Sequence, residues 1–147
     1  MKSVKFKNEM YLDSTSIVHK RKKLSDLLEG TTLYESETGL NQTTPIPLTD
    51  TASNYKRIKI YYKNDAENSQ IWNTAELFDA VGKKFTLETI RQGSVNTYKH
   101  TAEITVAEKQ INWGHYAQFT INGNGISDYS VNYQGLIRIY KVVGYEY

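Results

Sequence analysis

Arg57-Ile58-Lys59-Ile60-Tyr61-Tyr62-Lys63 is the most regular stretch of this sequence. Ile58, Ile60 and Tyr62 share one parity, and the charged residues share the other. A two-residue period of this kind is typical of a strand with one buried face, because successive side chains of a strand point to opposite sides. The stretch therefore predicts a half-buried β-strand in the middle of the chain.

The same alternation recurs along most of the chain. Further strands are predicted at residues 4–12, 85–90, 102–106, 117–121, 129–133 and 136–143, with shorter ones near Leu33 and at 46–48. Asn122-Gly123-Asn124-Gly125 supplies the residues of a tight hairpin turn. The last strand loses its phase at Lys141, which predicts a β-bulge or partial burial of both faces. Short strands at this spacing favour a mostly β protein, an antiparallel β-sandwich of jelly-roll-like type.

The segment 74–82 allows two interpretations. Its apolar residues could form two helical turns that end at Gly82, or a strand followed by a turn at residues 82–84 and the strand at 85–90. We favour the second interpretation, because it keeps the regular spacing of short strands. Pro45 and Pro47 place the strand at 46–48 at the edge of a sheet, since proline cannot donate a hydrogen bond to a neighbouring strand.

The first 30 residues differ from the rest of the chain. The strand at 4–12 is followed by one short helix, predicted from Ile17 to Glu29 and ended by Gly30. We therefore divide the chain into an attachment or oligomerisation segment at 1–30 and a β-sandwich head domain at 31–147. The residues expected to make contacts between chains are Phe6, Met10, Leu12, Ile17, Leu24, Leu27 and Leu28.

Composition excludes several classes of protein. The chain has 147 residues, enough for one domain. It has no Cys, which rules out disulfides, zinc–cysteine sites and thiol nucleophiles. Lys and Arg number 18 against 16 acidic residues, and this net charge is too small to indicate a nucleic-acid-binding or membrane-surface protein. No apolar run predicts a signal peptide or a membrane span.

No arrangement of residues in the sequence predicts an enzyme. The three His residues lack the spacing of metal ligands, and we find neither a nucleophile motif nor a phosphate-binding loop. Glu35 and Glu37 share one strand face, as the acid pair of a glycosidase would, but such pairs also arise by chance among 16 acids. The basic run at 19–23 has no interleaved aromatic residues, which favours a solvated surface over nucleic-acid binding. We expect no catalytic residue, no metal and no cofactor.

Aromatic residues with polar neighbours are better candidates for a binding site. Rings offer large, flat contact area at low entropy cost, which suits both sugars and proteins. For Trp113 the interpretation stays open between a core residue and a binding residue. Trp72 and Asp128 are chosen for their chemistry, because no spacing in the sequence brings them close to the other candidates. The predicted saccharide site consists of Trp113, His115 and Tyr116, with Trp72 and Asp128 as chemically chosen neighbours.

Several segments of the sequence carry a resemblance to a known family. They are Met10-Tyr11-Leu12-Asp13-Ser14-Thr15, Val18-His19, Arg21-Lys22-Lys23-Leu24-Ser25, Leu33-Tyr34-Glu35, Asn54-Tyr55 and residues 58–62 and 137–145. These segments resemble tail and fibre proteins of phages that infect Gram-positive bacteria. The resemblance implies a virion tail or baseplate protein that is made in the bacterial cytoplasm and is usually trimeric. It also implies a β-sandwich head that touches the host surface.

The resemblance and the residues together leave three functions open. The first is a phage tail protein whose head binds host cell-wall saccharide. The second is a purely structural tail component that binds only other phage tail proteins. The third is a small cell-wall hydrolase, for which the sequence offers no acid–base constellation beyond a possible carboxylate pair. In none of the three do we expect a nucleic-acid partner or insertion into a membrane.

We predict a homotrimer, with self-association drawn from the residues and the number three drawn from the resemblance. A lone strand and a short helix cannot bury the apolar residues of 4–28 by themselves, and each leucine-sized side chain contributes about 1.5–3 kcal/mol when buried. Light scattering should therefore give three times the chain mass of 16.9 kDa. A monomer at micromolar concentration would contradict the prediction, and removal of residues 1–30 should leave a folded head that associates more weakly.

Overall fold

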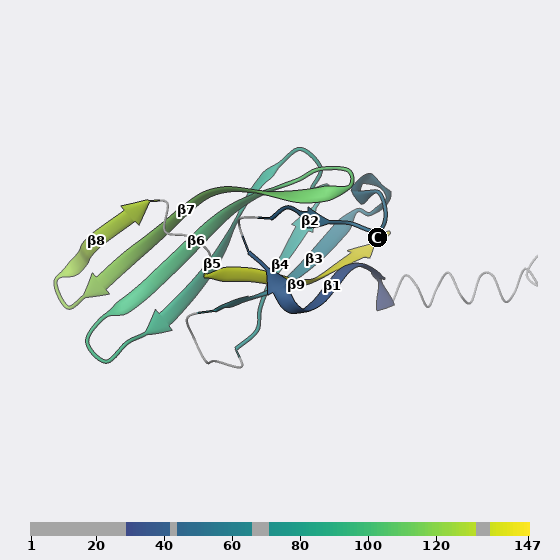
Figure 1. The fold of residues 1–147 in the computed structure, drawn as a ribbon. Coiled ribbons are helices and arrows are strands. Elements are labelled where there is room, and N and C mark those ends of the chain that lie inside the picture. The colour runs from purple at the N-terminus through teal and green to yellow at the C-terminus, as the bar shows by residue number, and fades with distance from the viewer. Residues whose placement is uncertain (1–28, 42–43, 66–70, 132–135) are drawn as a thin grey trace, which may run out of the picture.

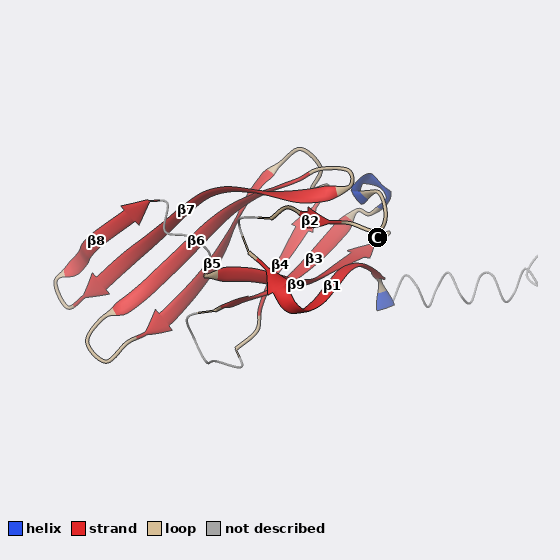
Figure 2. Cartoon of the chain, in the orientation of Figure 1, coloured by secondary structure: helices blue, strands red, loops and turns tan. Residues whose placement is uncertain are grey.

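The computed structural model describes residues 29–41, 44–65, 71–131 and 136–147, and it arranges them as two antiparallel sheets around one core (Figures 1 and 2). The strands are β1 (Thr31–Leu40), β2 (Ile46–Pro47), β3 (Arg57–Asn64), β4 (Asn73–Phe78), β5 (Lys84–Gln92), β6 (Thr97–Val106), β7 (Gln110–Asn122), β8 (Gly125–Val131) and β9 (Ile137–Tyr145), with a short 3-10 helix, η1 (Ala52–Asn54), between β2 and β3. The predicted mostly β class and antiparallel sandwich are confirmed.

The nine described strands divide between two sheets. Sheet A has the order β1-β9-β3-β4, and sheet B has the order β2-β7-β6-β5, with β8 also paired to β7. The chain crosses from one sheet to the other after β1, β2, β4 and β8. In Figure 1 the two hairpins of sheet B, β5–β6 and β7–β8, extend beyond the end of sheet A. Part of sheet B is therefore not faced by any described strand of sheet A.

The core lies between the inner faces of the two sheets, and the alternation of β3 predicts which of its side chains enter that core. Ile58, Ile60 and Tyr62 are buried, as their parity predicts. They belong to one cluster that also includes Leu87 and Ile104 of sheet B. Burial of such side chains contributes about 1.5–3 kcal/mol each, so the alternating strand pattern accounts for both the fold class and the position of the core.

Polar groups also join the sheets across the core. The Tyr62 hydroxyl donates to the carbonyl oxygen of Glu88 at 3.0 Å, and the Asn64 amide donates to the Thr89 hydroxyl at 2.8 Å. Asn64 and Thr89 are both buried. Satisfied hydrogen bonds of this kind avoid the cost of burying a lone polar group, and they fix how the end of β3 lies against β5.

Three local predictions are confirmed by the course of the chain. The segment 74–82 forms strand β4 and a turn before β5, as the second interpretation held. The two-residue strand β2 pairs with β7 and with no other described strand, so it lies at the sheet edge, where a proline that cannot donate a hydrogen bond is tolerated. Asn122 pairs with Gly125, whose φ of +105° lies in the region that favours glycine, and so forms the predicted hairpin between β7 and β8.

The predicted irregularity near Lys141 is a β-bulge. Opposite β3, Tyr61 pairs with Lys141 while the next residue, Tyr62, pairs with Ile139, so Tyr140 is the extra residue. Farther along β9, Val142 and Val143 are both buried. Both explanations offered for the loss of phase, a bulge and burial of both faces, therefore apply to β9.

Of the predicted attachment segment, the structure describes only Glu29 and Gly30. The strand predicted at 4–12, the predicted helix from Ile17 as far as residue 28 and the seven apolar residues expected to join chains lie outside the described residues. The proposed homotrimer and the division of the chain at residue 30 stay predictions.

We predict that Gly144→Ala destabilises the sandwich by about 1–3 kcal/mol, the usual cost of overpacking. A Cβ at this position would lie 2.5 Å from the Cγ atom of Tyr55, and Gly144 is buried in the central strand β9. Gly123→Ala is the matched control, because a Cβ there meets no atom within 4 Å. Urea unfolding checks both variants, and equal stability of the two would contradict the packing assigned to Tyr55.

Candidate functional site

The outer face of sheet A carries two adjoining hollows, which we call together the aromatic groove. Their volumes are about 430 and 640 Å³. Both are lined by Glu35, Ser36, Trp72 and Tyr140. The first hollow adds Tyr61, Thr74 and Lys141, and the second adds Glu37 and Lys63. Small-molecule sites are concave surfaces of this size with apolar walls and a few polar groups.

Trp72 and Tyr140 form the common wall of the two hollows. Their ring centroids are 5.2 Å apart and their planes are inclined by 82°, which is the edge-to-face arrangement that aromatic pairs prefer. Trp72 is 49% exposed, although it is one of the largest apolar side chains of the chain. The pair therefore presents a fixed aromatic surface to solvent rather than to the core.

The bulge in β9 explains why this wall exists. In a regular strand, Tyr140 and Lys141 would point to opposite faces of the sheet. Because Tyr140 is the extra residue of the bulge, both side chains line the same groove. Trp72 immediately precedes β4, on the far side of β3, so it reaches Tyr140 across the strand between them.

An arch in β1 forms the opposite wall. Glu35 pairs with Lys141 and Leu40 pairs with Ile139, so the four residues 36–39 of β1 stand opposite the single residue Tyr140 of β9. The Gly39 backbone N–H donates to the Ser36 hydroxyl at 3.1 Å, which closes the arch. Gly39 has a φ of +66°, and a Cβ there would lie 3.0 Å from the Tyr140 ring. Glycine is thus required where the arch packs on that ring.

Charged groups are distributed around these rings. The Lys141 ammonium lies 3.0 Å from a Glu35 carboxylate oxygen, and the Lys63 ammonium lies 3.9 Å from the centroid of the Trp72 ring. Burial and the nearby Asp65 carboxylate raise the pKa of the Tyr140 hydroxyl, which therefore stays a neutral donor and acceptor at physiological pH. The groove thus combines flat apolar rings with hydroxyl, carboxylate and ammonium groups.

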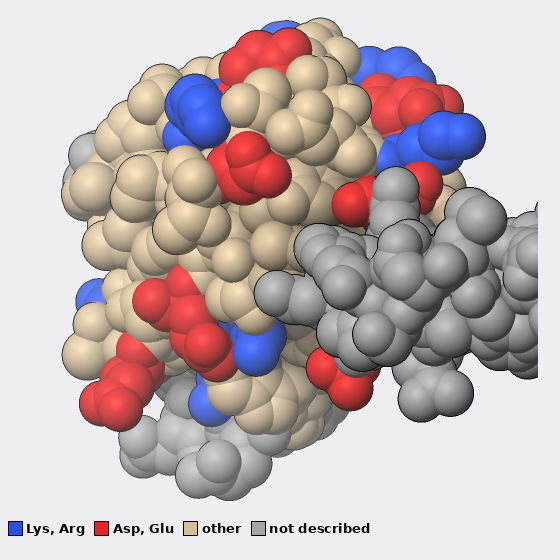
Figure 3. Space-filling view, turned by 90° about the vertical axis from the view of Figure 1, so that its right-hand side faces the viewer, with Lys and Arg blue, Asp and Glu red and all other residues tan. Residues whose placement is uncertain are grey.

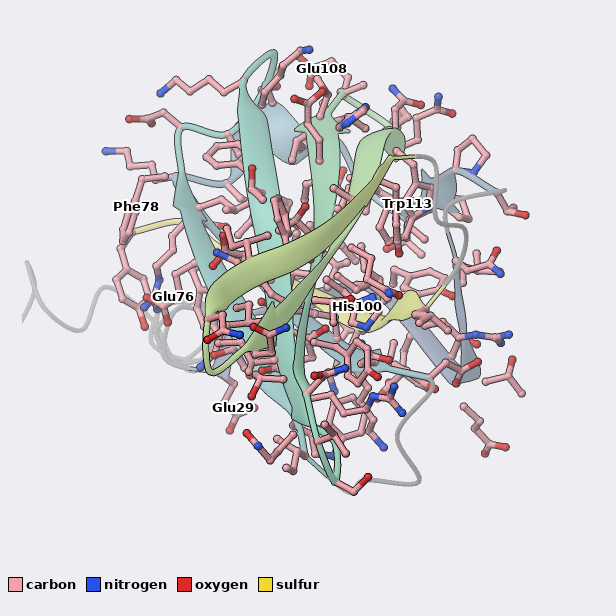
Figure 4. All side chains as sticks on the ribbon, turned by 90° about the vertical axis from the view of Figure 1, so that its left-hand side faces the viewer. Glu29, Glu76, Phe78, His100, Glu108 and Trp113 are labelled. Atoms are coloured by element: carbon pink, nitrogen blue, oxygen red, sulfur yellow. The ribbon has the colours of Figure 1, made fainter. Side chains whose placement is uncertain are left out.

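The five residues of the predicted saccharide site do not form one site in the structure. Trp72 alone lines the aromatic groove. Trp113 lies in β7 of sheet B, where it packs against the core and its indole N–H donates to the Thr44 carbonyl at 3.0 Å. Figure 4 places Trp113 on the opposite side of the molecule from Glu76 and Phe78 of β4, the strand that Trp72 precedes. The two tryptophans thus belong to different surfaces.

The other three predicted residues also lie on sheet B. Tyr116 is a core residue: it is 3% exposed, and its hydroxyl accepts from the backbone N–H of Ile137 at 2.9 Å and donates to the carbonyl of the same residue at 3.1 Å. His115 is exposed beside it in β7. Asp128 lies in β8, where its backbone pairs with Thr120. Because the Tyr116 ring is buried, it cannot contact a saccharide together with Trp113, as the sequence had predicted.

Four main members of the groove were not predicted from the sequence, although the outward parity of two of them was a signal. Tyr61 and Lys63 carry the outward parity of β3, so their exposure followed from the alternation. Tyr140 and Lys141 sit at the phase loss of β9, which marked an irregularity without showing where either side chain would point. Their approach to Trp72 depends on the order of the strands in sheet A, which no local pattern encodes.

Among the described residues, no group of three or more His, Asp or Glu side chains could hold a metal ion. No described helix has both the length and the apolar character needed to cross a membrane. On the face shown in Figure 3, Lys and Arg side chains lie beside Asp and Glu side chains rather than in a patch of one sign.

Comparisons with family models, with curated proteins and with solved structures find no match for this chain.

We predict that Tyr116→Phe lowers the free energy of unfolding by about 1–3 kcal/mol and leaves saccharide binding unchanged. The variant leaves a buried N–H and a buried carbonyl of Ile137 without the hydroxyl that pairs with them, and unsatisfied buried groups cost about this much. Urea unfolding and a binding assay with cell-wall polysaccharide test the two parts. Weakened binding at full stability would return Tyr116 to the binding site.

Proposed function

We propose that this chain is the saccharide-binding head of a phage tail or baseplate protein, and that the aromatic groove holds the saccharide. The observation that carries the proposal is the exposed ring of Trp72, fixed edge-to-face on Tyr140 and surrounded by polar groups. A sugar ring has an apolar face that packs on an aromatic ring and a hydroxyl rim that needs donors and acceptors. Glu35, Ser36 and Thr74 supply such groups at the edges of the groove.

The phage context is supported by the resemblance of the N-terminal and C-terminal segments to tail and fibre proteins. In this proposal the chain is made in the bacterial cytoplasm and functions in the virion tail. Its partners there are other tail proteins and the host cell-wall saccharide. A single shallow groove with a Kd of about 1 mM would contribute only about −4 kcal/mol. A homotrimer would raise the avidity by about 10²–10⁴, provided one polymer spans its three grooves.

A purely structural tail component is the second candidate, and one surface favours it. Ile90, Val95 and Ile126 are exposed on the hairpins of sheet B that extend beyond sheet A (Figure 1). Because no described strand covers this part of sheet B, these side chains are available for contact with another protein. Binding only to other tail proteins, with no affinity for cell wall, would favour this candidate. Release of sugar reducing ends would instead favour the hydrolase.

We predict that Trp72→Ala weakens binding to purified cell-wall polysaccharide of the Gram-positive host about 10- to 100-fold. This range corresponds to about 1.5–3 kcal/mol for the lost burial of a large side chain. The melting temperature should change little, because the side chain is half exposed. A pull-down with the polysaccharide and a thermal melt measure the two effects.

Phe78→Ala is the matched control for this experiment. Phe78 is 59% exposed and lies on strand β4 of the same sheet, but it does not line the groove. The control should bind the polysaccharide as the unaltered chain does. Equal binding by the Trp72 variant, or equal loss in both variants, would contradict the proposed site.

A further inference from the structure

The aromatic wall of the groove already has a cation on it. The Lys63 ammonium lies 3.9 Å from the centroid of the Trp72 ring and 5.2 Å from that of Tyr140. Both distances fall within the range in which a cation is attracted to the negative face of a ring. The chain's own side chain thus shows that this pair of rings accommodates an ammonium group.

Lys63 differs from the other outward-facing cations of sheet A. Each of the others has a carboxylate oxygen within ion-pair distance: Arg57 and Lys59 with Glu76, Arg138 with Asp65, and Lys141 with Glu35. Lys63 forms no ion pair with any residue in the described part of the chain. Among those residues, its contact with the two rings is the interaction that holds its ammonium in the groove.

The hollow that contains Lys63 also contains carboxylates. Glu35 and Glu37 both line it. Lys141 neutralises Glu35 at 3.0 Å, whereas Glu37 has no ion pair with a residue in the described ranges. Aromatic faces together with an uncompensated carboxylate are the groups that recognise an ammonium ligand. An anionic ligand would meet the Lys63 ammonium but also the Glu37 carboxylate, whereas a cationic ligand can take the place of Lys63 on the rings.

We propose that the ligand of the aromatic groove is a saccharide with a free, protonated amino group, and that this ammonium replaces Lys63 on Trp72 and Tyr140. The inference rests on the proposed saccharide-binding function and names the class of saccharide. Lys63 acts as an internal competitor that keeps the rings occupied when no ligand is bound. Its long flexible side chain leaves for solvent at small cost, since an exposed cation–ring contact is weak.

The experiment compares two oligosaccharides that differ only in whether the amino group is free or acetylated. Titration of the full chain with the tetrasaccharide of glucosamine and with that of N-acetylglucosamine, followed by tryptophan fluorescence, should show tighter binding of the free amine. Lys63→Met keeps an apolar side chain of similar length and removes the competing charge. It should raise the affinity for the glucosamine oligomer about two- to five-fold, the worth of an exposed cation–ring contact.

Two further variants sharpen the test. Glu37→Gln should weaken binding of the glucosamine oligomer and leave that of the N-acetylated oligomer unchanged. Lys83→Met is the matched control: this exposed lysine lies in the turn before β5, outside both hollows, and its loss should change neither affinity.

The inference is overturned if the N-acetylated oligomer binds as tightly as the free amine, if the free amine does not bind, or if Lys63→Met leaves its affinity unchanged. In each case the proposed function stands as long as cell-wall polysaccharide still binds and Trp72→Ala weakens that binding. If the unaltered chain does not bind cell-wall polysaccharide at all, the proposed function itself is rejected.

Discussion

Strand β9 holds both the sandwich and the groove together. It lies inside sheet A, between β1 and β3, and pairs with both. Its inward residues Ile137, Ile139 and Val142 are fully buried in the core. Its bulge turns Tyr140 and Lys141 together to the outer face. The same strand therefore supplies part of the core on one side and a wall of the candidate site on the other, so the site is positioned by a strand that is paired along both edges.

Contacts at both ends of β9 fix its position. At the start of the strand, the buried hydroxyl of Tyr116 bonds both backbone groups of Ile137 and so ties sheet A to sheet B. Near the end of the strand, Gly144 leaves room for the Tyr55 ring, whose hydroxyl donates to Asp50 at 2.8 Å. These contacts limit how far β9 can slide, and a shift by one residue would turn every side chain of the strand to the other face.

The sequence was sufficient for the elements of the fold but not for the site. Alternation such as that of Ile58 and Ile60 is local, because a strand repeats every two residues, and it identified the fold class and the buried face of β3. The meeting of Trp72 with Tyr140 is not local. The contact between these rings depends on the order of strands in sheet A, which is set by pairings between segments far apart in the chain. It also depends on the β-bulge, which directs the Tyr140 side chain to the outer face. Trp113 carried the same chemical signal as Trp72, and only the fold separates a ring bonded to Thr44 from one exposed in a groove.

The two tryptophans of the chain allow the central claim to be measured in one spectrum, because each indole N–H gives its own resonance. In a ¹H–¹⁵N correlation spectrum recorded during titration with host cell-wall polysaccharide fragments, the Trp72 indole signal should shift progressively. The Trp113 signal should stay in place, since its N–H is bonded to a backbone carbonyl on sheet B. A shift of Trp113 with an unchanged Trp72 would contradict the assignment of the aromatic groove as the saccharide site.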